Sequence, residues 1–299
     1  MRNRFGPVLL AVFSIACLIA GPRPSPAYFE RVFLSARNQS MGGAFVGVAN
    51  DASATIINPA GLTEVNSVSF LSSLARPYGL SDLSESCIAA AVPTRFGNVG
   101  LAWHRFALED VTSEDLFSLS FGRDLIRRSQ GASLSIGAGL DVVNVSYAED
   151  EIDDSKTAIS GSVGVLLRPF PMIGIGYAVR NIGEPSFDFI AGGGATSLGM
   201  THTFGLAYHW NDACSILYDR ERDQDAKWQN RFGLEVFAGA NLRVRAGLAG
   251  SDVTGGIGVV ISNLTIDAGV TAHEVLGTTY MVSVGVALPS GDEKGPGKW

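Results

Sequence analysis

The chain has 299 residues, of which 46% are hydrophobic, 17% are charged and 36 are glycine, and its formal net charge is -7. Charge this sparse argues against a disordered or coiled-coil chain, four histidines and three cysteines are too few for a metal or disulfide scaffold, and the negative balance argues against a nucleic-acid-binding surface. Because glycine in a helix interior costs about 1 kcal/mol relative to alanine, the glycine content also disfavours an all-α protein.

The first residues have the three-part layout of a secretory signal. Arg2 and Arg4 give a basic start, an apolar stretch runs over residues 5–21, and small residues at Ser25 and Ala27 mark a cleavage site after Ala27. An uncleaved membrane anchor is the alternative, but the apolar stretch is shorter than the roughly 20 residues that span a bilayer. We therefore predict a signal peptide over residues 1–27 and export of the rest of the chain.

The next part of the chain, residues 28–65, does not alternate as a strand does. Small residues fill positions 40–55, and an Asn-Pro-Ala-Gly turn at residues 58–61 closes the stretch. Pro59 removes a backbone donor and Gly61 can adopt positive φ, so this part can form a compact element that packs closely against other backbone. The simpler alternative is an N-terminal arm.

From Asn66 onward the hydrophobic period is two. One face of residues 201–210 carries Phe204, Leu206, Tyr208 and Trp210, and the other carries small or polar residues, His209 among them. Residues 172–181 and 279–288 repeat the pattern. A soluble sandwich would set charged residues opposite its apolar face, whereas a barrel in lipid turns bulky residues outward and small or polar ones toward its lumen. The pattern favours the barrel, with a glycine-rich soluble sandwich as the alternative.

The alternating segments predict about fourteen strands, most of them near the 9 to 11 residues that cross a membrane at a tilt. Short connections alternate with longer ones, as in single-chain outer-membrane barrels, although 123–131 is long for its rim and 251–253 is short. The barrel is expected over residues 66–288, with a polar tail at 289–299. The strands are expected at 66–75, 86–93, 97–106, 115–122, 132–147, 156–168, 172–181, 201–210, 213–221, 229–238, 242–250, 254–261, 264–272 and 279–288.

Register gives an independent test of this facing. Pairing Ala238 with Leu242 around the 239–241 turn sets Glu235 against Arg245 on the inner face. Across residues 262–263, Gly258 meets Asp267 on the same face. The polar side chains expected to face the lumen are therefore Glu235, Arg243, Arg245, Asp267 and His209.

The longer connections are mostly acidic, notably Glu109-Asp110, Glu114-Asp115, residues 149–154 and residues 219–225. Such runs could bind calcium or bridge lipopolysaccharide through divalent ions, but none has the glycine and terminal glutamate of an EF-hand loop. We favour solvated loops and predict no metal site.

Two cysteines remain beyond the leader, Cys87 and Cys214, and they are far apart in sequence. A single disulfide between them is possible in an oxidising compartment, but two buried thiols are the favoured interpretation.

Recognisable catalytic motifs are absent: the sequence has no HExxH, Walker A, GxSxG or CxxC pattern. An outer-membrane lipase would need His104 or His209 beside a serine and a polar group that orients the histidine. We expect a non-catalytic protein without a cofactor.

The segment Met41 to Leu62, MGGAFVGVANDASATIINPAGL, resembles the N-terminal hatch of the FadL-like superfamily of outer-membrane proteins, and its GGAFVGVANDASA wording is closer to the PorV/PorQ branch. The resemblance implies a 14-stranded barrel that this segment plugs from the periplasmic side. It identifies the hatch motif as Met41, Gly42, Gly43, Asp51, Asn58, Pro59, Ala60 and Gly61.

The expected function is that of a PorV/PorQ-like outer-membrane barrel, a hatch-gated channel or docking barrel in transport or secretion. One alternative is a FadL-like uptake channel for fatty acids or other hydrophobic small molecules, which would hold an apolar pocket between hatch and wall. Another is a soluble periplasmic all-β binding module. The expected location is the outer membrane of a Gram-negative-type bacterium. The expected partners are outer-membrane lipid and either a hydrophobic ligand or secretion-machinery proteins, but not nucleic acid.

Overall fold

The computed structural model describes residues 33–129, 131–149, 152–187, 196–211, 213–223 and 228–288. The predicted leader and the predicted polar tail lie outside these residues. Among the described residues, no helix is long and apolar enough to cross a membrane.

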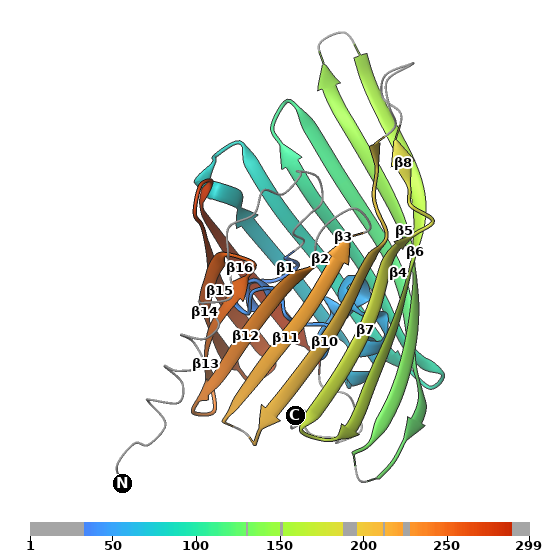
Figure 1. Cartoon of the computed structure of the whole chain (residues 1–299), viewed down its shortest axis with the longest axis vertical. Coiled ribbons are helices and arrows are strands. Elements are labelled where there is room, and N and C mark those ends of the chain that lie inside the picture. Colours follow the sequence, from blue (N-terminus) through green and yellow to red (C-terminus); the bar gives the residue numbers. More distant parts are fainter. Residues whose placement is uncertain are drawn as a thin grey trace.

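Fourteen antiparallel strands form one closed barrel, in which each strand pairs with its neighbour in the chain and β1 closes the ring against β16 (Figure 1). A separate two-stranded sheet, β8 and β9, lies within the connection between β7 and β10. The barrel strands are β1 Ser69–Arg76, β2 Leu83–Thr94, β3 Gly97–Leu108, β4 Thr112–Arg127, β5 Ser133–Glu149, β6 Ile152–Phe170, β7 Ile173–Ile182, β10 Thr201–Trp210, β11 Cys214–Asp223, β12 Gln229–Ala238, β13 Leu242–Ala249, β14 Asp252–Ile261, β15 Leu264–His273 and β16 Gly277–Ala287.

The bulky residues of each strand point out of the barrel. In β10, the four large apolar side chains that alternate from Phe204 to Trp210 are at least 39% exposed, whereas Thr203, Ala207 and His209 are at most 7% exposed. The same inversion recurs around the ring. The predicted barrel, with its apolar face outside, is therefore confirmed, and the sandwich is wrong because no second layer covers these side chains.

The predicted register is also confirmed. Ala238 pairs with Leu242 and Glu235 with Arg245 across β12 and β13, and Gly258 pairs with Asp267 across β14 and β15. Once one hairpin turn is placed, period-two alternation fixes the face of every other residue in both strands.

Several strand ends differ from the prediction. The predicted 123–131 connection is mostly strand, because β4 continues to Arg127 through a register shift between Asp124 and Ile126. β5 and β6, of 17 and 19 residues, extend beyond the length needed to cross a bilayer and rise highest in Figure 1. The predicted 182–200 loop contains β8 (Ser186–Phe187) and β9 (Thr196–Ser197).

The predicted acidic loops are partly wrong. Glu114 and Asp115 lie within β4, and Asp219 to Asp223 lie within β11, so their side chains alternate across the wall instead of sharing a solvated loop. Glu114 and Asp219 are buried on the inner face. Cys87 is a buried free thiol and Cys214 is a partly buried one, which agrees with the favoured reading of the cysteines.

Residues 33–65, called the hatch below, lie inside the ring of strands (Figure 1, blue). The hatch contains α2 (Ala36–Ser40), α3 (Ala54–Ile57) and the 3₁₀ helix η1 (Pro59–Glu64). A further 3₁₀ turn, η2 (Pro77–Gly79), follows β1. The Ser35 hydroxyl caps α2 by accepting from the Asn38 N–H, and proline begins η1, where a missing donor costs nothing.

Candidate functional site: the plugged lumen

The inner wall is built of glycine where it meets the hatch. A β-carbon at Gly176 would lie 2.2 Å from the Val46 carbonyl oxygen, and one at Gly174 would lie 2.2 Å from that of Gly47. The wall glycines that touch the hatch in this way are Gly100, Gly122, Gly137, Gly164, Gly174, Gly176, Gly205, Gly233, Gly247, Gly256 and Gly269. Real β-carbons do not approach this closely, so the backbone and side chains of the hatch reach the wall only because these positions lack side chains.

The predicted motif residues Met41, Gly42 and Gly43 sit in this contact. Met41 is fully buried against Gly233 and Gly247. Gly42 and Gly43 have φ of 65° and 76°, and a β-carbon at Gly42 would lie 2.4 Å from the Leu248 carbonyl oxygen. Both the backbone conformation and the lack of space therefore require glycine at position 42.

Asn58 holds the turn that ends α3. Its Nδ2 donates to the Val46 carbonyl at 3.0 Å and to the Val165 carbonyl of β6 at 3.3 Å, while its Oδ1 accepts from the Ala60 N–H at 3.2 Å. One buried amide thus joins two parts of the hatch to the wall. Gly61 packs against Ala49, to whose carbonyl oxygen a β-carbon would approach within 2.1 Å.

Asp219 of β11 fixes the middle of the hatch. Its Oδ2 accepts from the backbone N–H groups of Phe45, at 2.8 Å, and Val46, at 2.9 Å. Its neighbour on the inner face, Glu221, lies 2.5 Å from Arg231 and 3.3 Å from Arg180. Asp219 and Glu221 fall both at the end of the predicted strand 213–221 and in an acidic run interpreted as a solvated loop, and the structure places both in the strand. Asp219 and Glu221 continue the alternation of the inward-facing residues Ser215 and Leu217, and this pattern could have predicted that both face the lumen.

An ion-pair chain links the hatch to the wall across three strands. The Arg37 guanidinium lies 3.2 Å from Asp51 within the hatch and 3.2 Å from Glu235 of β12. Glu235 also accepts from Arg245 of β13 at 2.8 Å, and Arg245 donates to Asp267 of β15 at 2.6 Å. One network therefore joins the predicted residues Asp51, Glu235, Arg245 and Asp267. Arg37, which links Asp51 to Glu235, was not predicted from the sequence.

A second network binds the end of the hatch near the rim of short turns. Glu64 lies 3.2 Å from Arg168 and 3.6 Å from Arg127. The Asn98 amide donates to the Leu62 carbonyl at 2.6 Å and to the Val65 carbonyl at 2.7 Å. Charged or amide side chains of the wall thus hold the hatch at both of its ends.

The other two predicted lumen residues do not join these networks. Arg243 lies at the rim, with its guanidinium 4.6 Å from the centre of the Phe237 ring. His209 is buried on the inner face, where its Nδ1 lies 2.8 Å from the Ser215 hydroxyl oxygen. A histidine beside a serine is the pair that a lipase would need, but both side chains are buried.

On the side of the longer connections, part of the lumen is apolar. Val143 and Val145, on the inner face of β5, pack against Phe187 of β8 and Leu198, which follows β9. Phe187 and Leu198 therefore cover an apolar stretch of the inner wall.

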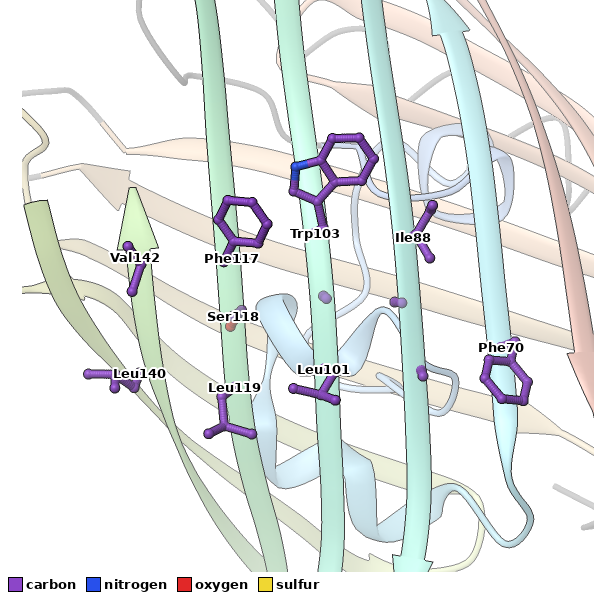
Figure 2. Close-up of a pocket in the computed structure, with 12 residues that line it drawn as sticks. Phe70, Ile88, Leu101, Trp103, Phe117, Ser118, Leu119, Leu140 and Val142 are labelled. Atoms are coloured by element: carbon purple, nitrogen blue, oxygen red, sulfur yellow. The ribbon is translucent and has the colours of Figure 1, made fainter. Parts of the chain in front are cut away.

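The outer wall carries an apolar hollow of about 460 Å³, formed by β1 to β5. Figure 2 shows its rim, with Phe70, Ile88, Leu101, Trp103 and Phe117 projecting from neighbouring strands. The small side chains of Ala89, Ala90 and Ala102 line it as well. The pocket expected for an uptake channel was to lie between hatch and wall, whereas this hollow opens outward.

In the part of the chain that the structure describes, no group of three or more histidine, cysteine or acidic residues is placed to hold a metal ion.

Comparison with known proteins gives structural neighbours only. No protein-family model matches the chain, and no curated protein matches it. Among solved structures it is similar to the CymD monoaromatic hydrocarbon channel, with a TM-score of 0.63, 13% identity, and coverage of 88% of this chain and 100% of that one. It is also similar to the Ralstonia pickettii toluene transporter TbuX, with a TM-score of 0.59, 14% identity, and coverage of 86% and 98%. A Pseudomonas aeruginosa FadL homologue gives a TM-score of 0.63, 11% identity, and coverage of 87% and 100%.

Proposed function

We propose that this chain is a non-catalytic outer-membrane channel of the FadL-like superfamily that takes up hydrophobic small molecules. The observation that carries the proposal is a barrel whose lumen is filled by its own N-terminal segment. The solved structures similar to this barrel include hydrocarbon channels, and the similarity covers nearly the whole length of those chains. The sequence pattern favours a PorV/PorQ-like barrel with uptake as the alternative, whereas the solved neighbours favour uptake. The secretion role is supported only by the sequence similarity of residues 41–62 to the PorV/PorQ branch.

In this proposal the short turns face the periplasm and the longer connections face outward, as in other single-chain outer-membrane barrels. The cargo binds at the apolar cluster that Val143 and Val145 of the inner wall form with Phe187 and Leu198. An apolar surface binds hydrocarbon by removing it from water, and the gain scales with the area buried. The hatch then separates this surface from the periplasm until it shifts.

Uptake by cells that produce the protein tests the proposal. Radiolabelled toluene and a long-chain fatty acid are offered to cells with the wild-type barrel and to cells with Val143→Thr/Val145→Thr, which keeps the shape of the side chains and adds hydroxyl groups. We expect the wild type to raise uptake and the threonine variant to reduce it, because burying each hydroxyl without a partner costs roughly 1 to 3 kcal/mol.

The matched control is Val143→Ile/Val145→Ile, which keeps the surface apolar and should retain uptake. Equal uptake with and without the wild-type barrel, together with loss of a secreted protein on deletion of the chain, would replace the uptake function by the secretion role. A protein recovered in the soluble periplasmic fraction would rule out both.

A further inference from the structure

One acidic run of the sequence, residues 219–225, contains two arginines whose side chains lie on the outer surface of the barrel. Alternation along β11 turns Asp219 and Glu221 inward, where they bind the hatch backbone and the inner-wall arginines. Arg220 and Arg222 fall on the opposite face and are exposed. The strand therefore separates the two signs of charge, and only the positive side chains reach the outer surface.

These two arginines share an aromatic neighbour. The guanidinium carbons of Arg220 and Arg222 lie 4.9 Å and 5.8 Å from the centre of the Trp228 ring. On the flanking strands, Arg220 pairs in register with Phe204 and Asn230, and Arg222 pairs with His202. None of these outward neighbours is acidic, and among the described residues neither guanidinium forms an ion pair.

The cluster marks the upper edge of the apolar band. Below it on β11 lie Ile216, which is exposed, and Tyr218, whose hydroxyl donates to Asn230 at 2.9 Å. In membrane barrels, aromatic residues with polar tips and arginines with extended side chains gather where hydrocarbon gives way to headgroups. Arg220, Arg222 and Trp228 thus stand at headgroup level on the rim of longer connections.

We propose that Arg220 and Arg222, supported by Trp228, bind a phosphate of a phosphorylated glycolipid in the outer leaflet, lipid A. Residues two apart on one strand face lie roughly 6.6 Å apart, so two guanidinium groups can hold one phosphate from both sides. Arginine suits this role because its planar fork donates two parallel hydrogen bonds to phosphate oxygens. The chain as a whole is acidic, so attraction of an anionic lipid has to come from a local cluster such as this one.

This inference rests on the outer-membrane location proposed above but not on the cargo. The test uses the purified full-length barrel in detergent, titrated with diphosphoryl lipid A and followed by native mass spectrometry. We expect one bound lipid A in the wild type and an apparent affinity at least about tenfold lower in Arg220→Gln/Arg222→Gln, since each lost contact is a charge-assisted hydrogen bond. Trp228→Leu should cause a smaller loss.

The matched control is Arg95→Gln/Arg243→Gln. These arginines also lie over aromatic rings, 4.5 Å from Phe96 and 4.6 Å from Phe237, but they stand at the opposite rim. The control makes the same change in net charge and should leave lipid A binding unaltered. Unchanged affinity in the Arg220/Arg222 variant, or an equal loss in both double variants, overturns the site. Heat-modifiable gel mobility confirms that each variant is folded.

Two further arms identify the ligand chemistry. Lipid A without its phosphates should bind no better to the wild type than to the Arg220/Arg222 variant. If excess inorganic phosphate displaces lipid A completely, the cluster is a free-anion site and the lipid proposal is wrong. Because binding is measured in detergent, failure of hydrocarbon uptake would leave this result intact, and loss of lipid A binding would leave uptake to be judged separately.

Discussion

The Arg37 guanidinium of the hatch lies 3.2 Å from the Glu235 carboxylate of β12, and this contact joins the plug to the wall on the inner side of the barrel. Glu235 is almost fully buried and also binds Arg245, so its two arginine partners come from different parts of the chain. Removing Arg37 would leave Glu235 with Arg245 alone and would take away charge-assisted hydrogen bonds inside the barrel, which costs more than an exposed ion pair would. The pair therefore ties the position of the hatch to the wall.

Replacing Arg37 with methionine should loosen the hatch. Glu235 would keep Arg245, but Asp51, which is partly exposed, would lose its ion-pair partner, and we expect a loss of roughly 1 to 3 kcal/mol of hatch stability. Planar-bilayer recordings should show larger or more frequent conductance steps than the wild type. The double variant Arg37→Met/Glu235→Leu removes both charges and should recover part of the loss. Identical recordings for wild type and Arg37→Met would contradict a latch at this contact.

Adding one methyl group to the glycine surface should displace the hatch. In Gly176→Ala the new β-carbon would meet the Val46 carbonyl oxygen at 2.2 Å, and backbone cannot move aside as the end of a side chain can. We expect destabilisation of about 1 to 3 kcal/mol and faster proteolysis within residues 33–65. Gly285→Ala is the control, because its nearest neighbours would be 3.8 Å away. Equal proteolysis in the two variants would argue against close packing at Gly176.

Asn58→Ala should release the turn of the hatch. The change removes three hydrogen bonds and leaves the carbonyl groups of Val46 and Val165 without their amide donor, so we expect a loss of roughly 1 to 3 kcal/mol. Asn58→Asp keeps the oxygen that accepts from Ala60 but replaces the donating amide with an anion beside those carbonyls. It should therefore not rescue the loss. Hydrogen exchange of the hatch amides measures the effect, and rescue by aspartate would show that the donors are dispensable.

Val284→Arg should destabilise the barrel in bilayers. Val284 is exposed on the outer face of β16, where an arginine at mid-strand costs roughly 2 to 4 kcal/mol in lipid. Equilibrium unfolding from vesicles measures the change. Val275→Arg, in the connection between β15 and β16, is the control and should be nearly neutral because position 275 is 83% exposed outside the strands. A Val284→Arg barrel of unchanged stability would show that this face does not contact hydrocarbon.

The strand count, the facing of the side chains and the hairpin register could all be predicted from sequence because each depends on local rules. A period of two assigns Phe204 and His209 to opposite faces without knowledge of any neighbouring strand, and a tight turn at 239–241 then fixes the Glu235–Arg245 pair. Strand ends were less predictable. β4 passes through Asp124 by a local register shift, which the hydrophobic pattern does not mark.

The prediction that the acidic runs form solvated loops was partly wrong. Glu114 is predicted in a loop and Asp219 in an acidic run at the end of a strand, yet each faces the lumen, where the Asp219 carboxylate accepts from the hatch backbone. Asp115 lies on the outer face and accepts from the Trp103 indole N–H at 2.8 Å. The hatch partners of Asp219 lie more than 170 residues away in the sequence, so no local window contains them.

The sequence by itself determined that bulky side chains face outward and small ones inward, because that choice is written in the alternation along each strand. Why the inner residues are small was decided only in three dimensions. Gly176 and Gly247 are glycine because the backbone of Val46, Met41 and Gly42 presses against them. These contacts join residues more than a hundred positions apart, and they form because the barrel closes around the hatch. The hydrophobic period of a single strand cannot predict such contacts.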